Sequence, residues 1–265
     1  MGIFEAVVLG AVQGLTEFLP VSSSGHLVLF QKIIGVSEPA LFFDTLLHCG
    51  TLAAVFLVLR RDIWALIKKP VQPLTLYLII GTIPTVIVGL LFKDFIEEAF
   101  AEGAFLGYAF IFTALALFSA EYLSGLPGRE RRDGDINGLD ALIIGVLQAV
   151  AIMPAVSRSG LTLSGALSRR LERGFAARFS FLLAIPAILG ALVLQIHDLA
   201  AGQGGVPIET LPVIAGTLTA ALVGIVSVSL MLKLVREHSL RGFGIYTAVL
   251  GILVLADQHL SRLFF

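Results

Sequence analysis

The residues between positions 13 and 26 could do chemistry, because their polar side chains interrupt an otherwise apolar segment. Glu17 and His26 can exchange protons, and Ser23 precedes His26 by three residues, so one helical turn would place hydroxyl and imidazole on the same face. This spacing suits a serine nucleophile with a histidine base, while Glu17 orients the imidazole or holds a metal ion. The candidate residues here are Gln13, Glu17, Ser22, Ser23, Ser24, Gly25 and His26.

A second polar break contains Ser157, Arg158 and Ser159. An arginine inside an apolar segment needs an anion, and a phosphate suits the two-pronged guanidinium. Free amides at the start of a half-helix near Ser23 would favour the same anion. Structural alternatives stay open: Arg158 could form a buried ion pair with Glu17, Glu17 could cap a helix, and Ser22 or Ser24 could be an N-cap.

Composition places the chain in a membrane. Of its 265 residues, 57% are hydrophobic and 14% are charged, against about 25% charged in a typical soluble domain. Several apolar runs reach the roughly 20 residues that a helix needs to cross a bilayer. We therefore predict an all-α integral membrane protein. The single cysteine, Cys49, excludes an internal disulfide, and His48 beside it is interpreted as a core or cavity residue.

Six full-length spans are predicted, over Pro39–Leu59, Leu74–Phe92, Phe105–Leu123, Ala176–Ile196, Leu211–Leu232 and Phe243–Ala256. Two further apolar segments, Ile3–Gly35 and Leu139–Leu167, are each broken by a polar cluster into arms of unequal length. Non-helical backbone in a bilayer must be buried in protein or line a wet cavity, so we interpret both as re-entrant helical hairpins. A full span followed by an interfacial helix is the alternative for either segment.

The sequence repeats itself at an offset of 135 residues. Gly10, Gln13, Val21, Ser22, Ser24 and Gly25 fall on Gly145, Gln148, Val156, Ser157, Ser159 and Gly160, and Gly81 falls on Gly216. We therefore predict a single membrane domain, 1–265, made of repeats 1–123 and 138–265. The linker 124–137, rich in glycine and charge, is expected to be solvated.

The charges predict how the two repeats are oriented. Of the 18 Lys and Arg residues, 14 lie in four segments, at 60–69, 129–132, 169–178 and 233–241, whereas the segment 93–103 is acidic. Placing the basic segments and the linker in the cytoplasm makes the repeats run in opposite directions, as an inverted repeat. The two hairpin turns would then meet near the middle of the membrane, with Arg158 beside Glu17, Ser23 and His26.

These motifs resemble the signatures of the bacterial undecaprenyl-diphosphate phosphatase family, the bacitracin-resistance membrane proteins. The resemblance covers essentially the whole chain and rests on Gln13-x-x-x-Glu17, on Pro20-Val21-Ser22-Ser23-Ser24-Gly25-His26 and on Pro154-Ala155-Val156-Ser157-Arg158-Ser159-Gly160-Leu161-Thr162. That family carries Glu or Gln at the first position, and Gln13 supplies no second carboxylate for a divalent cation. Ala155 stands where the family usually has glycine, which bears on the tightness of the second turn.

The resemblance implies hydrolysis of undecaprenyl diphosphate to undecaprenyl phosphate and inorganic phosphate, recycling the lipid carrier of peptidoglycan synthesis in the bacterial cytoplasmic (inner) membrane. By motif position, the catalytic roles fall to Glu17, Ser23, His26 and Arg158, and substrate binding falls to Gln13, Ser22, Ser24, Gly25, Ser157, Ser159 and Thr162. We expect Ser23 to attack the terminal phosphorus, His26 with Glu17 to take its proton, and Arg158 to stabilise the charge. A Mg²⁺ or Ca²⁺ ion near Glu17 is expected to assist.

Three alternatives are kept. Direct attack by His26 would give a phosphohistidine. Type 2 phosphatidic acid phosphatases share a Ser-Gly-His triplet and a Ser-Arg pair, but they need a histidine five residues beyond the second arginine position, and none follows Arg158 until His197. A transporter of an anion would also use inverted repeats with broken helices, but without need of a hydroxyl beside an imidazole. We expect a polyprenyl diphosphate and membrane lipid as partners and no nucleic acid, and leave a homodimer open.

Overall fold

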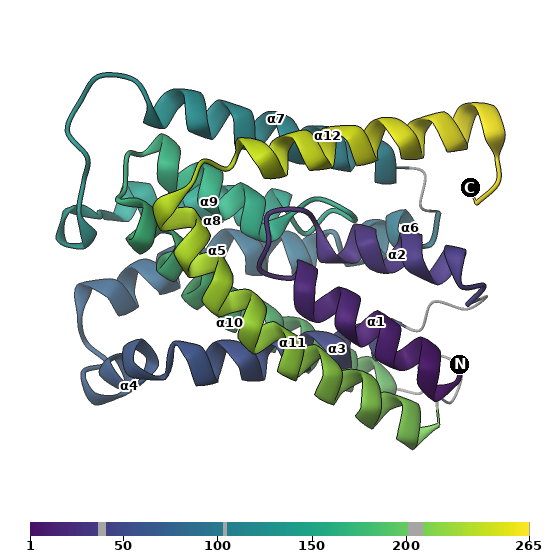
Figure 1. The fold of residues 1–265 in the computed structure, drawn as a ribbon. Coiled ribbons are helices and arrows are strands. Elements are labelled where there is room, and N and C mark those ends of the chain that lie inside the picture. Colours follow the sequence, from purple (N-terminus) through teal and green to yellow (C-terminus); the bar gives the residue numbers. More distant parts are fainter. Residues whose placement is uncertain (37–40, 103–104, 201–208, 265) are drawn as a thin grey trace.

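A computed structural model describes residues 1–36, 41–102, 105–200 and 209–264, and this part of the chain is built of helices (Figure 1). Their bounds are α1 Ile3–Thr16, α2 Ser23–Ile33, α3 Leu41–Val58, α4 Arg60–Lys68, α5 Pro73–Leu91, α6 Lys93–Glu102, α7 Leu106–Ser124, α8 Gly138–Val150, α9 Arg158–Ser168, α10 Arg173–Ala200, α11 Thr210–Glu237 and α12 Arg241–Ala256. The prediction of an all-α protein is confirmed.

Five helical segments are long and apolar enough to cross a membrane, among the residues that the structure describes. They are Pro73–Leu91, Leu106–Ser124, Arg173–His197, Thr210–Glu237 and Arg241–Leu260. A sixth candidate is α3, which continues into α4 after a bend of 78°. It matches the predicted span Pro39–Leu59, of which residues 39 and 40 lie outside the described residues. Five or six spans therefore agree with the six predicted.

Residues 93–102 of the acidic segment 93–103 form the short helix α6, which lies outside the candidate spans. Lys, Glu and Ala favour a helix, and Ile96 and Ala99 lie three residues apart, so that they share a face on which Ala99 is buried. Figure 1 places α6 and both termini at one end of the molecule, and α4 and the loop between α7 and α8 at the other. Acidic and basic segments thus lie at opposite ends.

Each polar break separates two short helices that fold back on one another. The four helices, α1, α2, α8 and α9, have 14, 11, 13 and 11 residues, so that none reaches the length of a span. Ser22 Oγ accepts a hydrogen bond from the Gly25 amide, and Ser157 Oγ accepts one from the Gly160 amide. These two serines are the N-caps of α2 and α9, which confirms the N-cap interpretation for Ser22.

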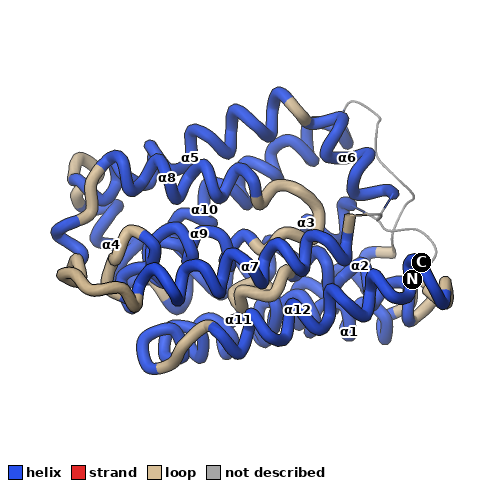
Figure 2. Tube along the Cα trace, turned by 90° about the horizontal axis from the view of Figure 1, so that it is seen from above, coloured by secondary structure: helices blue, strands red, loops and turns tan. Residues whose placement is uncertain are grey.

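The hairpins pack against long helices through glycines. A Cβ atom on Gly10 of α1 would collide with the backbone of Gly216 on α11, and one on Gly145 of α8 would collide with the backbone of Gly81 on α5. Figure 2 shows α5 beside α8, with α11 lying near α1. Small residues let helix backbones approach closely where the hydrophobic effect between helices is weak. Gly10 and Gly145 are equivalent positions of the repeat, and so are Gly81 and Gly216. Each hairpin therefore packs on a long helix of the other half through the same pair of positions.

A core of large side chains anchors the first turn. Phe18 follows Glu17, is fully buried and meets Phe181 of α10 edge to face, with ring centroids 5.2 Å apart. Outward faces of the spanning helices expose apolar side chains, such as Leu222 and Val226 of α11. The chain therefore buries its polar turns and presents hydrocarbon to its surroundings, as a bilayer requires.

The segment between α7 and α8, most of whose described residues are exposed, is tied to the fold by a buried carboxylate. Asp140, fully buried at the start of α8, accepts hydrogen bonds from Arg131 Nη2 at 2.6 Å and from Arg169 Nε at 2.7 Å. Burial raises the pKa of Asp140, but hydrogen bonds from the two guanidinium groups outweigh burial and hold this pKa below its usual value. Asp140 thus joins the linker to the end of α9.

Replacing Asp140 by asparagine removes the charge that the two arginines share at nearly constant size. We expect Asp140→Asn to lower the free energy of unfolding at pH 7 by about 1.5–3 kcal/mol, as for hydrogen bonds to a charged group. Because the folded-state pKa is depressed, this contribution is present above the unfolded value of about 3.9 and is lost as the pH falls through the folded value. Thermal unfolding of both proteins in detergent measures the difference, and a difference that widens in acid would contradict the assignment.

Candidate active site

The two hairpin turns touch each other, as the inverted arrangement predicted. Ser159 Oγ at the start of α9 donates a hydrogen bond to the carbonyl oxygen of Leu19 at 2.8 Å. Ser24 Oγ at the start of α2 accepts one from the amide of Ala155 at 3.2 Å. Each turn is therefore held by a serine from the other hairpin, and Ser24 and Ser159 are equivalent positions of the repeat.

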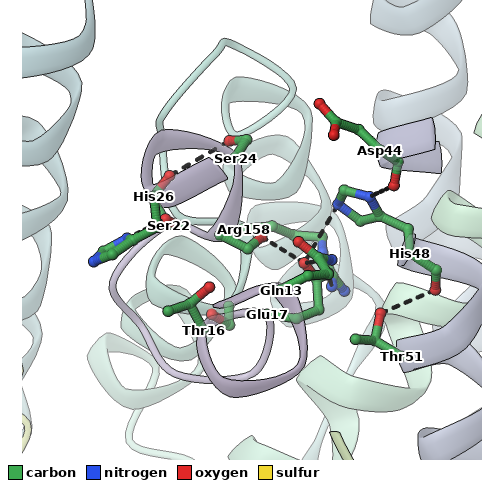
Figure 3. Close-up of polar contacts among 12 residues, drawn as sticks. Gln13, Thr16, Glu17, Ser22, Ser24, His26, Asp44, His48, Thr51 and Arg158 are labelled. Carbon is green, nitrogen blue, oxygen red and sulfur yellow. Dashed lines mark hydrogen bonds and ion pairs between the residues drawn. The ribbon is translucent and has the colours of Figure 1, made fainter. Parts of the chain in front are cut away.

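Glu17 lies at the centre of this contact (Figure 3). Its Oε1 pairs with Arg158 Nη2, while its Oε2 accepts hydrogen bonds from Gln13 Nε2 at 2.9 Å and Ser23 Oγ at 2.5 Å. His48 Nε2 on α3 lies 3.4 Å from the same oxygen, and the Glu17 side chain is only 3% exposed. One buried carboxylate thus gathers donors from α1, α2 and α9, with the imidazole of His48 on α3 beside it.

His26 was expected to take the Ser23 proton, but the two side chains bond to other groups. His26 Nδ1 lies 2.7 Å from the carbonyl oxygen of Ser22, and its Nε2 lies 2.7 Å from the hydroxyl of Tyr246. Ser23 and His26 both lie in α2, but the Ser23 hydroxyl is bonded across the break to Glu17. The carboxylate of Glu17, and not the imidazole, is therefore placed to accept the Ser23 proton.

Both turns contain a non-glycine residue in the left-handed region of backbone space. Ser22 has φ of 70° and Ala155 has φ of 62°, conformations that cost on the order of 1–3 kcal/mol each unless glycine adopts them. The structure thereby explains why glycine suits the position of Ala155. Such strain persists where surrounding contacts enforce it, and here it coincides with the turns that carry Ser23 and Arg158.

The remaining predicted residues hold the two turns together. Ser22 and Ser157 cap helices, Ser24 and Ser159 bridge the turns, and Thr162 Oγ1 donates to the carbonyl oxygen of Arg158 at 2.8 Å. Gly25 leaves no room for a Cβ because Phe110 packs against it. Contacts of these residues with a substrate stay a prediction.

Two residues at the site were not assigned from the sequence. His48 donates from Nδ1 to the carbonyl oxygen of Asp44 at 2.7 Å, which aims its Nε2 at Glu17. A histidine in the middle of a spanning helix is by default a functional candidate, and this signal supports the cavity interpretation of His48. Tyr246 of α12 is separated from His26 by 220 residues, and no local pattern pointed to that contact.

The arrangement favours an anion. Both α2 and α9 begin at the contact, Ser23 and Arg158 being their first residues, so free amides and positive helix ends lie on either side of Glu17. Arg158 and His48 are partly exposed there, with 17% and 27% of their side chains accessible. A phosphate entering between the two turns would meet an arginine, two helix ends and a serine hydroxyl already bonded to a carboxylate.

A divalent cation would have to share its ligands with a substrate. Within the described ranges, no three His, Cys, Asp or Glu side chains are grouped closely enough to hold a metal ion. Mg²⁺ commonly uses one or two carboxylates together with substrate phosphates. Glu17 is such a carboxylate, and Gln13 Oε1 beside it is a buried oxygen without a hydrogen-bond partner in the described part of the chain. These two side chains fit an ion that arrives with a diphosphate.

Known proteins resemble this chain over nearly its whole length. Residues 6–253 match the family model described as bacitracin resistance protein BacA. The chain belongs to this family. Undecaprenyl-diphosphatase from Carboxydothermus hydrogenoformans is 49% identical, covering 99% of this chain and 100% of the relative, and undecaprenyl-diphosphatase 3 from Bacillus cereus is 47% identical over the full length of both. Undecaprenyl-diphosphatase from Methanosphaera stadtmanae is 38% identical over 96% of this chain and 98% of its own.

The contribution of the ion pair between Glu17 and Arg158 to the stability of this protein can be tested directly. Arg158→Ala leaves a buried carboxylate without its arginine and should destabilise the protein by about 3 kcal/mol. Adding Glu17→Gln removes the orphaned charge and should recover part of the loss, giving a coupling energy of about 0.5–3 kcal/mol in a double-mutant cycle of thermal unfolding.

The matched control for this cycle is the exposed pair of Arg236 and Glu237 on α11, whose nitrogen and oxygen lie 3.1 Å apart. Exposed pairs contribute about 0–1 kcal/mol, so Arg236→Ala should change the free energy of unfolding little. Strictly additive effects of Arg158→Ala and Glu17→Gln would contradict the structural role of the buried pair.

Proposed function

We propose that this protein is an undecaprenyl-diphosphatase, which hydrolyses undecaprenyl diphosphate to undecaprenyl phosphate and inorganic phosphate and confers bacitracin resistance. The observation that carries the proposal is the hydrogen bond from Ser23 to the buried carboxylate of Glu17, which also pairs with Arg158. Ser23 and Arg158 are the first residues of α2 and α9. Membership in the bacitracin resistance protein family supports the proposal, and so does the identity of its relatives as undecaprenyl-diphosphatases. In this role the protein recycles the lipid carrier of peptidoglycan synthesis.

In the proposed mechanism Ser23 Oγ attacks the terminal phosphorus. Its proton moves to Glu17 Oε2, the bond between this phosphorus and the bridging oxygen breaks, and undecaprenyl phosphate leaves. The proton on Glu17 passes to the departing undecaprenyl phosphate, which restores the carboxylate. Water then attacks the seryl phosphate and gives a proton to Glu17, and Glu17 returns it to Ser23 Oγ as the bond between this oxygen and phosphorus breaks and inorganic phosphate leaves. Arg158 touches Glu17 through Nη2, and the remaining N–H groups of its guanidinium can bind oxygens of the transferred phosphoryl group.

This mechanism replaces the role first predicted for His26. Both ring nitrogens of His26 are engaged and the residue is only 3% exposed, which disfavours it as a nucleophile and as the base for Ser23. The hydrogen bond from the Ser23 hydroxyl to the Glu17 carboxylate also favours hydrolysis over transport. A transporter needs a site for the anion but does not need an activated hydroxyl.

A Mg²⁺ or Ca²⁺ ion would be held by Glu17, Gln13 Oε1 and the substrate phosphates, where it would neutralise charge on the diphosphate. The proposal gives this ion an assisting role. Binding and orientation of the phosphates otherwise fall to Arg158 and to the amides that begin α2 and α9.

We place the protein in the bacterial cytoplasmic membrane as inverted repeats 1–123 and 138–265 joined by a cytoplasmic linker. The exchanged glycine contacts of α1 with α11 and of α8 with α5 support two halves of the same design. The reciprocal serine contacts between the two turns support it as well. The separation of α6 from α4 and the linker at opposite ends supports the orientation with basic segments in the cytoplasm.

Release of phosphate from undecaprenyl diphosphate by the purified protein in detergent tests the proposed activity. We expect Ser23→Ala to lower kcat by at least about 10²-fold because the nucleophile is lost, and to lower the melting temperature because the buried Glu17 carboxylate loses a hydrogen-bond donor. Ser24→Ala, the neighbouring control, should keep most of the turnover while lowering the melting temperature, since the Ala155 amide loses its acceptor. Binding without phosphate release by the wild-type protein would favour a transporter instead.

Gln13→Glu tests the metal ion. A second carboxylate beside Glu17 should lower the Mg²⁺ concentration for half-maximal activity by about tenfold, or ~1.4 kcal/mol, and should let Ca²⁺ raise the melting temperature without substrate. Gln148→Glu is the matched control, since Gln148 is the equivalent position in the second half and is followed four residues later by Ile152. Unchanged metal dependence in Gln13→Glu would remove the ion from this site.

A further inference from the structure

Tyr246 contacts the site from outside both hairpins. Its hydroxyl lies 2.7 Å from His26 Nε2, and the two ring planes differ by 12° with centroids 5.7 Å apart. Phe110 of α7 meets the same imidazole edge to face, with centroids 5.5 Å apart. His26 is 3% exposed whereas Tyr246 is 47% exposed, so Tyr246 keeps its hydroxyl on the site while much of the residue remains at the surface. Helices α7 and α12, which lie side by side in Figure 1, thus hold this imidazole.

The two contacts of the His26 ring hold it at both nitrogens. A carbonyl oxygen only accepts hydrogen bonds, so Nδ1 carries the hydrogen that is donated to the Ser22 carbonyl. In the neutral imidazole Nε2 is then an acceptor, and the Tyr246 hydroxyl donates to it. Without that hydroxyl, Nε2 would lose its partner, and the ring would be free to turn away from the Ser22 carbonyl for part of the time.

The Ser22 carbonyl matters because its peptide group leads directly to Ser23. Ser22 has φ of 70° and ψ of 97°, a conformation that needs outside support in a non-glycine residue. His26 supplies that support twice, through its ring and through its backbone amide, which lies 3.2 Å from the same oxygen. The resulting turn holds Ser23 Oγ 2.5 Å from Glu17.

We propose that Tyr246 is a positioning residue for the phosphatase reaction. Its hydroxyl anchors Nε2 of the His26 ring, and His26 in turn holds the strained turn that aims Ser23 at Glu17. Tyr246 does not touch the reacting atoms. This inference rests on the proposed function, and it also gives His26 a role that does not require direct contact with the nucleophile.

Tyr246→Phe removes the hydroxyl while keeping the ring and its exposed surface, so the fold should be retained. We expect kcat to fall by about tenfold or more with KM nearly unchanged, since misplacing a reacting group by ~1 Å can cost about 10²-fold. The melting temperature in detergent should stay close to the wild-type value. Tyr108→Phe is the matched control, because Tyr108 is a 56% exposed tyrosine on α7, and it should behave as wild type.

Nitrogen NMR of protein labelled with ¹⁵N-histidine gives a second readout, with the His26 signals assigned by their loss in His26→Gln. Wild-type His26 should show a protonated Nδ1 and an unprotonated Nε2 that accepts a hydrogen bond, and Tyr246→Phe should move the Nε2 signal to that of a nitrogen without a hydrogen-bond donor. A Tyr246→Phe protein with wild-type kcat, or with lowered kcat and an unchanged Nε2 signal, overturns the proposal. If the wild-type protein releases no phosphate although the Nε2 signal moves as expected, the proposed function fails while the link between Tyr246 and His26 stands.

Discussion

The buried carboxylate of Glu17 is the constraint on which the rest of the structure depends. An ionised carboxylate removed from water is unfavourable by several kcal/mol unless cations and hydrogen-bond donors surround it. Its partners here come from Gln13, Ser23, His48 and Arg158, on four different helices. Satisfying one charge therefore requires both hairpin turns and α3 to converge at a single point, and the same convergence gathers the arginine and helix ends that favour an anion.

Close packing of helix backbones and strained turns bring the partners of Glu17 together. Glycines at Gly10 and Gly145 let the hairpins approach the long helices. Strained turns at Ser22 and Ala155 then place the first residues of α2 and α9 on either side of Glu17. When a phosphate arrives, Arg158 can share its donors between the carboxylate and the substrate, so the interaction that assembles the site also belongs to its chemistry.

Features governed by local sequence and composition were predictable. The spans follow from apolar runs, the hairpins from their polar breaks, and the meeting of the two turns from the repeat and the charge pattern. The hydrogen bond of Ser23 was not predictable, because it depends on the backbone at Ser22 and not on spacing along a helix. Contacts of Tyr246 with His26 and of Asp140 with the linker were equally hidden, since tertiary packing alone brings those residues together.

The central claim is that Ser23, held by Glu17, becomes phosphorylated during turnover. Rapid mixing of the protein with undecaprenyl diphosphate labelled in its terminal phosphate, followed by detergent quenching and peptide mapping, tests this most directly. The account predicts acid-stable phosphoserine in the peptide that contains Ser23, and no such label in Ser23→Ala. Label that is lost in acid, survives in alkali and maps to His26 would contradict it.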